Sequence, residues 1–257
     1  MEIKQIKIEK NTAFLEASVT QDEVDIEKNH VIDEMIKNVS VKGFRQGKAP
    51  KAIAEKQLDP EKMGNHILSH VMNHLMEHAL EQYKYRLLGR PVLEDMKTEK
   101  TGGWTIKLQL PLYPEVKLGS YHTYLKGKGK DKKVENIYET LLEKEKFDVS
   151  PLIIDEEVNY SLERLATQAK SLNLPVEDYL KALGKSLDQV KKEYAESAEK
   201  SVKLDIILLA IAQIEKIDSS EQELLELAKV ASVSGQQLEQ LKSIVNRRKT
   251  IDYLMTI

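Results

Sequence analysis

The decapeptide at residues 41–50, VKGFRQGKAP, places one aromatic ring, two glycines and three cations within ten positions. Arg45 can place its planar fork on phosphate oxygens, and Lys48 can supply a compact positive charge. Phe44 can contribute roughly 2 to 3 kcal/mol to the free energy of binding if an apolar pocket of a partner removes its ring from water. This mixture of basic and aromatic chemistry fits a ribonucleoprotein surface better than naked RNA.

A solvated turn, with the phenyl ring folded back onto its own helices, is the alternative interpretation of these residues. The glycines permit backbone conformations closed to other residues, and Pro50 fixes φ where the next helix would begin, so we expect a loop of defined shape. Between residues 40 and 57 the only acidic residue is Glu55, and the basic residues are Lys42, Arg45, Lys48, Lys51 and Lys56. Composition alone does not decide between the two interpretations.

A second pattern that could do chemistry is HLMEH at residues 74–78, which has the H-x-x-E-H spacing of inverted zincins. His74 and His78 would face one metal ion from adjacent helical turns, and Glu77 would activate water. Two earlier histidines on the same segment keep the four-residue spacing. A hydrolytic zinc site also needs a third protein ligand and an enclosed cleft, so we expect no metal centre. A face of solvated histidines is favoured, with adventitious nickel or zinc binding as the alternative.

The elements that must position these residues form an α+β pattern over residues 1–112. We expect a hairpin over 6–19, a helix over 24–39, a short helix from Pro50 through Gln57, a long helix from Asp59-Pro60 to about Leu88, and a strand over 104–110. Thr20 and Glu23 have capping-box spacing at the start of the first helix. The predicted fold is an antiparallel sheet with long helices, and the 41–50 loop lies at a helix tip.

Residues 113–133 have no helical period and end in KGKGKDKK, so we expect an extended linker. The lysine run is interpreted as a soluble tether, with a secondary RNA contact as the alternative. Residues 134–257 have the pattern of an all-α domain. Helix starts are indicated at Ser150-Pro151 and Pro175 and by the pairs Ser186/Gln189, Ser220/Glu223 and Ser234/Gln237; the longest helix is expected over about 187–217.

The totals set limits on the class of protein. A length of 257 residues suits two domains, and a net charge of −3 argues against a general nucleic-acid binder, so basic surface must be local. There are no cysteines, which excludes a disulfide framework and thiol chemistry. No export signal and no run of about 18 apolar residues is seen, and we expect a cytoplasmic protein without a membrane partner.

The loop carries a family resemblance. Gly43-Phe44-Arg45, Gly47-Lys48 and Pro50 match the G-F-R-x-G-K-x-P signature of bacterial trigger factors, chaperones of the ribosomal exit tunnel. The segment LPLYPEVKLGSY is similar to the end of that family's ribosome-binding domain, and residues 141–165 and 176–217 are similar to its helical domain. The family's FKBP-like prolyl isomerase module usually lies between the two, and residues 113–185 have none of the strands, glycines or aromatics that it needs.

The resemblance implies an ATP-independent chaperone without a cofactor and without isomerase activity. Residues 1–112 would be a ribosome-binding domain and residues 134–257 a helical, client-binding domain. Its partners would be exit-tunnel protein and 23S RNA of the large subunit together with nascent and unfolded polypeptides, and a homodimer off the ribosome is left open. The implied docking residues are Gly43, Phe44, Arg45, Gly47, Lys48 and Pro50, with Lys42 and Lys51 as secondary basic contacts. The alternative is a ribosome-assembly or interaction factor without client-folding activity.

Overall fold

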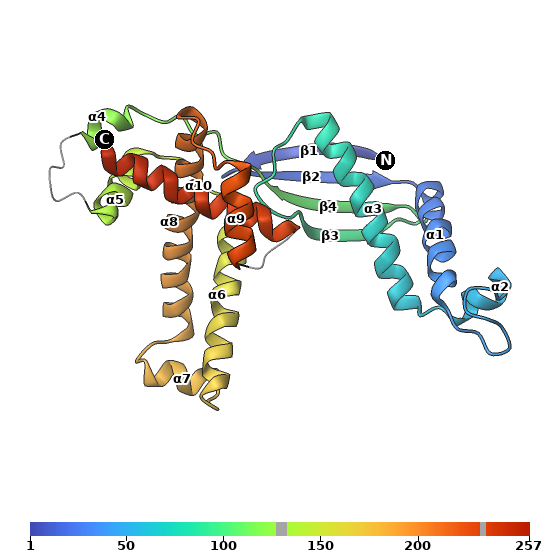
Figure 1. The fold of residues 1–257 in the computed structure, drawn as a ribbon. Helices are drawn as coiled ribbons and strands as arrows, with labels where there is room; N and C mark the ends of the chain where they lie inside the picture. Colours follow the sequence, from blue (N-terminus) through green and yellow to red (C-terminus); the bar gives the residue numbers. More distant parts are fainter. Residues whose placement is uncertain (127–132, 232–234) are drawn as a thin grey trace. The chain divides into compact units, whose positions relative to one another are not determined.

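The structure is a computed structural model that describes residues 1–126, 133–231 and 235–257 (Figure 1). Most of the KGKGKDKK run and the helix start predicted at Ser234 lie outside the described residues. The chain divides into two compact units, Met1–Tyr113 and Pro114–Ile257, and each is described by itself. Among the described residues, every helix is too short or too polar to span a lipid bilayer.

The first unit contains a four-stranded antiparallel sheet. Its strands are β1 (Glu2–Glu9), β2 (Thr12–Val19), β3 (Val92–Thr98) and β4 (Trp104–Pro111), in the spatial order β1-β2-β4-β3. The two central strands pair without interruption from Thr12 opposite Pro111 to Val19 opposite Trp104. Leu15 lies opposite Leu108 in this ladder, and both side chains are buried. The predicted antiparallel sheet is therefore confirmed.

The predicted hairpin and its turn are also present. Lys10 and Asn11 both have left-handed φ values, of 46° and 54°, as a tight two-residue hairpin turn requires. The first strand differs from the expectation, because Ile6 and Ile8 are exposed while Ile3 is buried. The register shifts between Gln5 and Lys7, and this bulge interrupts the alternation of faces along β1.

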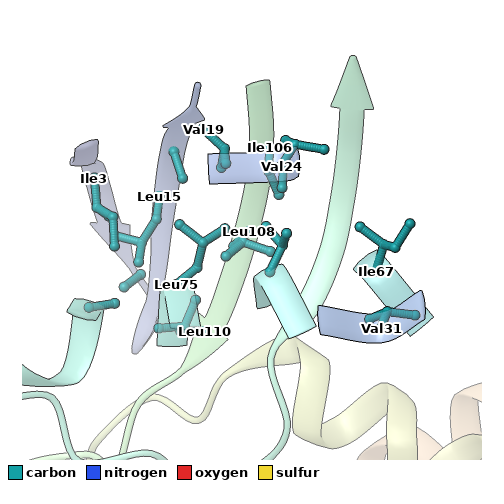
Figure 2. Packing of buried hydrophobic residues seen from close by; sticks show 14 residues of the cluster. Ile3, Leu15, Val19, Val24, Val31, Ile67, Leu75, Ile106, Leu108 and Leu110 are labelled. Atoms are coloured by element: carbon teal, nitrogen blue, oxygen red, sulfur yellow. The ribbon is translucent and has the colours of Figure 1, made fainter. Parts of the chain in front are cut away.

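Three α-helices and two 3-10 turns complete the regular structure of the first unit. The long helices are α1 (Gln21–Met35) and α3 (Pro60–Tyr83), and between them lie η1 (Ile36–Asn38), α2 (Lys51–Ala54) and η2 (Glu55–Gln57). The capping box of Thr20 and Glu23 is formed, and Asp59 caps α3. One side of α3 packs on the sheet and on α1; the cluster includes Val24, Val31, Ile67, Val71, Leu75, Ile106 and Leu108 (Figure 2).

Two features at the end of this unit differ from the sequence-based expectation. The long helix ends at Tyr83 rather than near Leu88, because Lys84 adopts a left-handed conformation and the following residues approach β4 through a bridge between Leu87 and Leu112. Strand β3 was not predicted. It is an edge strand whose side chains are almost all exposed, so it shows no alternation of apolar and polar residues.

The regular secondary structure described in the second unit consists of helices. They are α4 (Tyr121–Leu125), α5 (Val134–Lys144), α6 (Pro151–Ser171), α7 (Val176–Ala182), α8 (Leu187–Ile214), α9 (Glu221–Ala231) and α10 (Gln236–Thr256). Pro151 occupies the first turn of α6, and Ser186 and Gln189 form the predicted capping box of α8. The apolar last third of α8 is covered on one side by its neighbours, where Leu204, Ile207, Leu208 and Ile211 pack with Leu141 and Leu254. Leu209 and Ile214 of the same segment are exposed.

The expectation of an extended linker over residues 113–133 is wrong for part of that segment. Residues 121–125 form α4, and Tyr121 and Leu125 are buried in the core of the second unit. A helix of five residues is too short to show a helical period in the sequence. Its buried ring and leucine are held by tertiary packing instead.

Helices α6 and α8 lie side by side, with α7 at their far end (Figure 1). We call these three helices the arm. Its small core consists of Leu165, Leu180 and Val190, with Tyr179 and Tyr194 packed against it.

Candidate functional site

The residues of the VKGFRQGKAP stretch form a loop between η1 and α2, which we call the tip loop (residues 41–50). The loop and α2 lie beyond the ends of α1 and α3, away from the sheet (Figure 1). Backbone hydrogen bonds define its shape: Phe44 N donates to Val41 O at 3.0 Å, and Lys48 N donates to Arg45 O at 2.9 Å. Val41 is buried and anchors the start of the loop. The tip loop therefore has a fixed backbone.

Two glycines allow this path. Gly43 and Gly47 have φ values of 89° and 70°, a region that residues with a side chain rarely adopt. A Cβ at Gly47 would also lie 2.5 Å from the carbonyl oxygen of Lys37, whereas a Cβ at Gly43 would meet nothing within 4 Å. Gly47 N donates to Val39 O at 3.3 Å. The second glycine thus permits both the turn and a close approach to the end of η1.

Phe44 is held at the surface. Its relative exposure is 43%, and Ile53, on the first turn of α2, has the same value. Pro50 precedes that helix, and its carbonyl oxygen accepts hydrogen bonds from Ile53 N and Ala54 N at 2.9 and 3.0 Å. The alternative in which the phenyl ring folds into the unit's own interior does not fit this exposure. An exposed aromatic ring on a fixed loop is available to a partner.

The cations of the tip differ in their pairing. Lys42, Arg45 and Lys48 are exposed, and within the described part of the chain their side chains form no ion pair with a carboxylate. Lys51 is different, because its Nζ lies 2.7 Å from Asp33 Oδ1 on α1. The hydrogen bond and charge of Lys51 hold the pKa of the Asp33 carboxyl below its ordinary value. Three cations of the tip are therefore free to contact phosphates, and a fourth is paired.

The structure brings all the predicted docking residues together. Gly43, Phe44, Arg45, Gly47, Lys48 and Pro50 lie in the tip loop, Lys42 lies in it too, and Lys51 begins α2. The exposed Ile53 is an addition that the sequence analysis missed. The helix that carries Ile53 has only four residues, so the sequence has no periodic pattern that could have indicated its exposed side.

The histidines of α3 have a different environment from the one expected. Within the H-x-x-E-H pattern, His74 Nδ1 lies 3.7 Å from Glu77 Oε2. His70 is half-buried, and both His70 and His74 face Glu27 of α1. The expectation of a wholly solvated histidine face is wrong for His70, because α1 packs along this side of α3. The contribution of α1 was missed by sequence analysis.

The arm carries exposed apolar side chains of its own. Leu172, Leu174, Leu183 and Leu187 are exposed around α7, where the chain passes from α6 to α8; we call these four residues the arm end. A groove of about 730 Å³ lies along α6 and is lined by Tyr160, Arg164 and Tyr194 among others. The described part of the second unit therefore presents an apolar surface at the arm end and, separately, an open groove of mixed polarity along α6.

Comparison with known proteins gives matches over the whole chain. A family model described as bacterial trigger factor protein matches residues 1–145, and a model of the bacterial trigger factor C-terminus matches residues 120–257. The two matches overlap at residues 120–145, so no third domain lies between them. This agrees with the absence of an FKBP-like module inferred from the sequence.

Curated relatives carry the same family name. A trigger factor of Caldicellulosiruptor bescii is 31% identical over 97 residues, covering 38% of this chain and 22% of the relative. One from Geobacillus thermodenitrificans is 29% identical over 165 residues, covering 64% and 34%, and one from Streptococcus pneumoniae is 26% identical over 149 residues, covering 58% and 35%. The matched regions thus span about a third or less of these relatives' own length.

The fold has a solved counterpart. A trigger factor chaperone structure, described in terms of promiscuous substrate recognition in folding and assembly activities, superposes with a TM-score of 0.68 at 14% identity. The superposition covers 100% of this chain and 99% of that one, so the likeness includes both units. At this identity the likeness concerns the fold. The family itself follows from the two models that together cover the sequence: this chain belongs to the bacterial trigger factor family.

Proposed function

We propose that this chain is an ATP-independent chaperone that docks at the ribosomal exit tunnel through the tip loop and shields nascent polypeptides. In this proposal the first unit is a ribosome-binding domain and the second is a client-binding domain. The observation that carries it is the exposure of Phe44 beside Arg45 and Lys48 on a loop whose backbone is fixed. A preformed surface of this kind loses little conformational entropy on binding.

The chemistry of the tip fits a partner made of both protein and RNA. Burying the remaining exposed surface of Phe44 in an apolar pocket contributes on the order of 2 kcal/mol. Arg45 can make a bidentate contact with phosphate, and Lys48 supplies a second charge. We infer that the ring meets an exit-tunnel protein and that the cations meet 23S RNA. Lys42 acts as a secondary basic contact, and Lys51 contributes less because Asp33 already pairs with it.

The second unit would hold clients by weak, distributed contacts. Each exposed leucine of the arm end can contribute about 1 to 2 kcal/mol when it covers an apolar segment. Because each contact is small compared with the gain when a client buries its own side chains, release needs no nucleotide. The proposal therefore includes no cofactor and no catalysed reaction. It also proposes that the chain acts in the cytoplasm and that the free protein can form a homodimer.

The experiment that tests this function measures ribosome pelleting and client protection in parallel. We expect Phe44→Ala with Arg45→Ala and Lys48→Ala to abolish co-sedimentation with ribosomes. Suppression of aggregation of an unfolded client should stay within about twofold of the wild type, because the arm is untouched.

A matched control removes the same residue classes elsewhere on the first unit. Ile6, Arg90 and Lys100 are exposed, so the triple alanine variant at these positions loses one apolar and two basic side chains away from the tip. It should pellet with ribosomes as the wild type does. Pelleting of the tip variant at wild-type levels would end the docking proposal. Ribosome binding without client protection would favour the assembly-factor alternative, and acceleration of prolyl isomerisation during refolding would contradict the non-enzymatic role.

A further inference from the structure

A cluster of histidines and carboxylates lies where α1 and α3 pack together. Glu27, His30 and Glu34 are spaced three and four residues apart on α1 and so share one face of that helix. His70 and His74 are four residues apart on the facing side of α3. Behind them the two helices are joined by the apolar contacts of the first unit's core (Figure 2).

Within this cluster, three side chains have ligand atoms close to one another. One atom each from Glu27, His30 and His70 all lie within 4.8 Å of one another. His70 Nδ1 is 3.5 Å from Glu27 Oε2, and the rings of His30 and His70 meet edge to face with centroids 5.4 Å apart. We propose that Glu27, His30 and His70 bind one late first-row divalent cation of the zinc class.

The separations suit this coordination. Metal–ligand bonds of about 2.0 to 2.1 Å in a tetrahedral site place neighbouring ligand atoms about 3.4 Å apart. The Glu27–His70 pair is already at that separation. His30 has to close by at most about 1.4 Å, and its side chain is exposed, so a change of rotamer suffices. Two imidazoles with one carboxylate favour zinc, nickel or copper over magnesium or calcium.

Two further side chains are placed to orient the ligands. His70 Nε2 lies 3.5 Å from Glu34 Oε2, so that nitrogen can donate to a carboxylate while the other binds metal. His74 Nε2 lies 3.3 Å from Glu27 Oε1, the oxygen that the metal leaves unused. Such outer partners fix ring orientation and ligand basicity in metal sites. The proposed ligands differ from the H-x-x-E-H pattern, because the carboxylate ligand, Glu27, comes from α1 and because His78 is not a ligand.

Burial of Glu27 gives an independent reason for a cation here. Its side chain is only 10% exposed, and its recorded partners among the described residues are His70 and His74. An ionised carboxylate taken out of water needs a positive partner, which a bound cation supplies. A cavity of about 140 Å³ lies next to the cluster on the side of His74; Glu27 and His74 line it, and His30 and His70 do not. Bound metal would clamp α1 to α3 behind the tip loop.

The test uses the untagged full chain after chelation and dialysis into a non-coordinating buffer. Titration with zinc chloride in a calorimeter should show one site per chain, and magnesium chloride should give no binding. Cobalt chloride should give the visible absorption bands of a four-coordinate site. Zinc should also raise the melting temperature of the chain, because only the folded state holds the ligands together.

Matched histidine variants decide whether the cluster is responsible. His30→Ala and His66→Ala each remove an exposed histidine, but His66 lies one turn before His70, outside the cluster. His30→Ala should weaken zinc binding at least tenfold and remove the thermal shift, and Glu27→Gln should do the same. His66→Ala should bind as the wild type does. Equal losses in the two histidine variants, or no zinc binding at about 100 μM, would overturn the proposal.

Discussion

The molecule exposes apolar side chains in two ways. The tip loop presents Phe44 on a backbone fixed by hydrogen bonds and two left-handed glycines, and three free cations accompany it. The arm end presents four leucines without such a fixed arrangement: Leu172, Leu174 and Leu183 lie in the turns that flank α7, and Leu187 begins α8. A single preformed contact suits one partner of fixed shape, whereas scattered contacts suit partners of many shapes. In the proposed function, the tip is therefore the specific ribosome-binding surface and the arm is the surface that tolerates many clients.

Salt should separate the two surfaces most strongly. If three or four tip cations contact phosphates, ribosome affinity should fall tens of fold between about 50 and 200 mM salt. Client binding to the arm should change by less than about twofold, since apolar burial is not screened. Fluorescence anisotropy of the labelled chain with ribosomes, and of a labelled unfolded client with the chain, measures both. Equal salt dependence of the two interactions would remove the distinction.

The shape of the tip loop can be changed without altering the side chains of Phe44, Arg45 and Lys48. Gly47→Ala places a Cβ against the Lys37 carbonyl in a left-handed conformation, and such strain costs about 1 to 3 kcal/mol. We expect ribosome affinity to fall about tenfold as the loop leaves its docking shape. Gly43→Ala is the control, because it introduces the same kind of φ strain without the clash. Gly43→Ala should lower ribosome affinity less than Gly47→Ala does. A larger fall in affinity for Gly43→Ala would contradict the proposed role of loop shape.

The distributed nature of the arm end predicts weak single effects. Changing Leu172, Leu174, Leu183 and Leu187 together to serine should reduce suppression of client aggregation by about threefold to fivefold, while ribosome pelleting stays unchanged. Each single change should alter client protection by less than twofold, because each leucine provides a small part of the apolar area. Loss of all protection from one single change would show a specific site rather than a distributed surface.

Local signals predicted much of this fold. The capping boxes of Thr20 and Ser186 are present where their spacing indicated, because each is a bond between residues three positions apart. The strand from Trp104 is likewise found, since a half-buried central strand must alternate its faces. The tip loop was predicted as a defined turn from its glycines and Pro50, whose effects are also local.

Features that depend on distant partners were missed. Strand β3 is recognisable only by its pairing with β4, and α4 only by the burial of Tyr121 and Leu125. The histidine cluster needed the packing of α1 on α3, which no spacing within α3 reveals. Sequence patterns therefore predicted the elements that are determined by residues close together in the sequence. The elements that depend on packing between distant segments became visible only in the structure.

The central claim is that the tip loop itself contacts the ribosome at the exit tunnel. The chain has no cysteine, so Ser40→Cys beside the loop and Ser18→Cys on β2 each provide one exposed thiol. With a short thiol-directed cross-linker and purified ribosomes, we predict adducts of the Ser40→Cys chain with large-subunit components at the exit tunnel. We predict none with the Ser18→Cys chain. Equal cross-linking from both positions, or none from position 40 while the chain pellets with ribosomes, would contradict the claim.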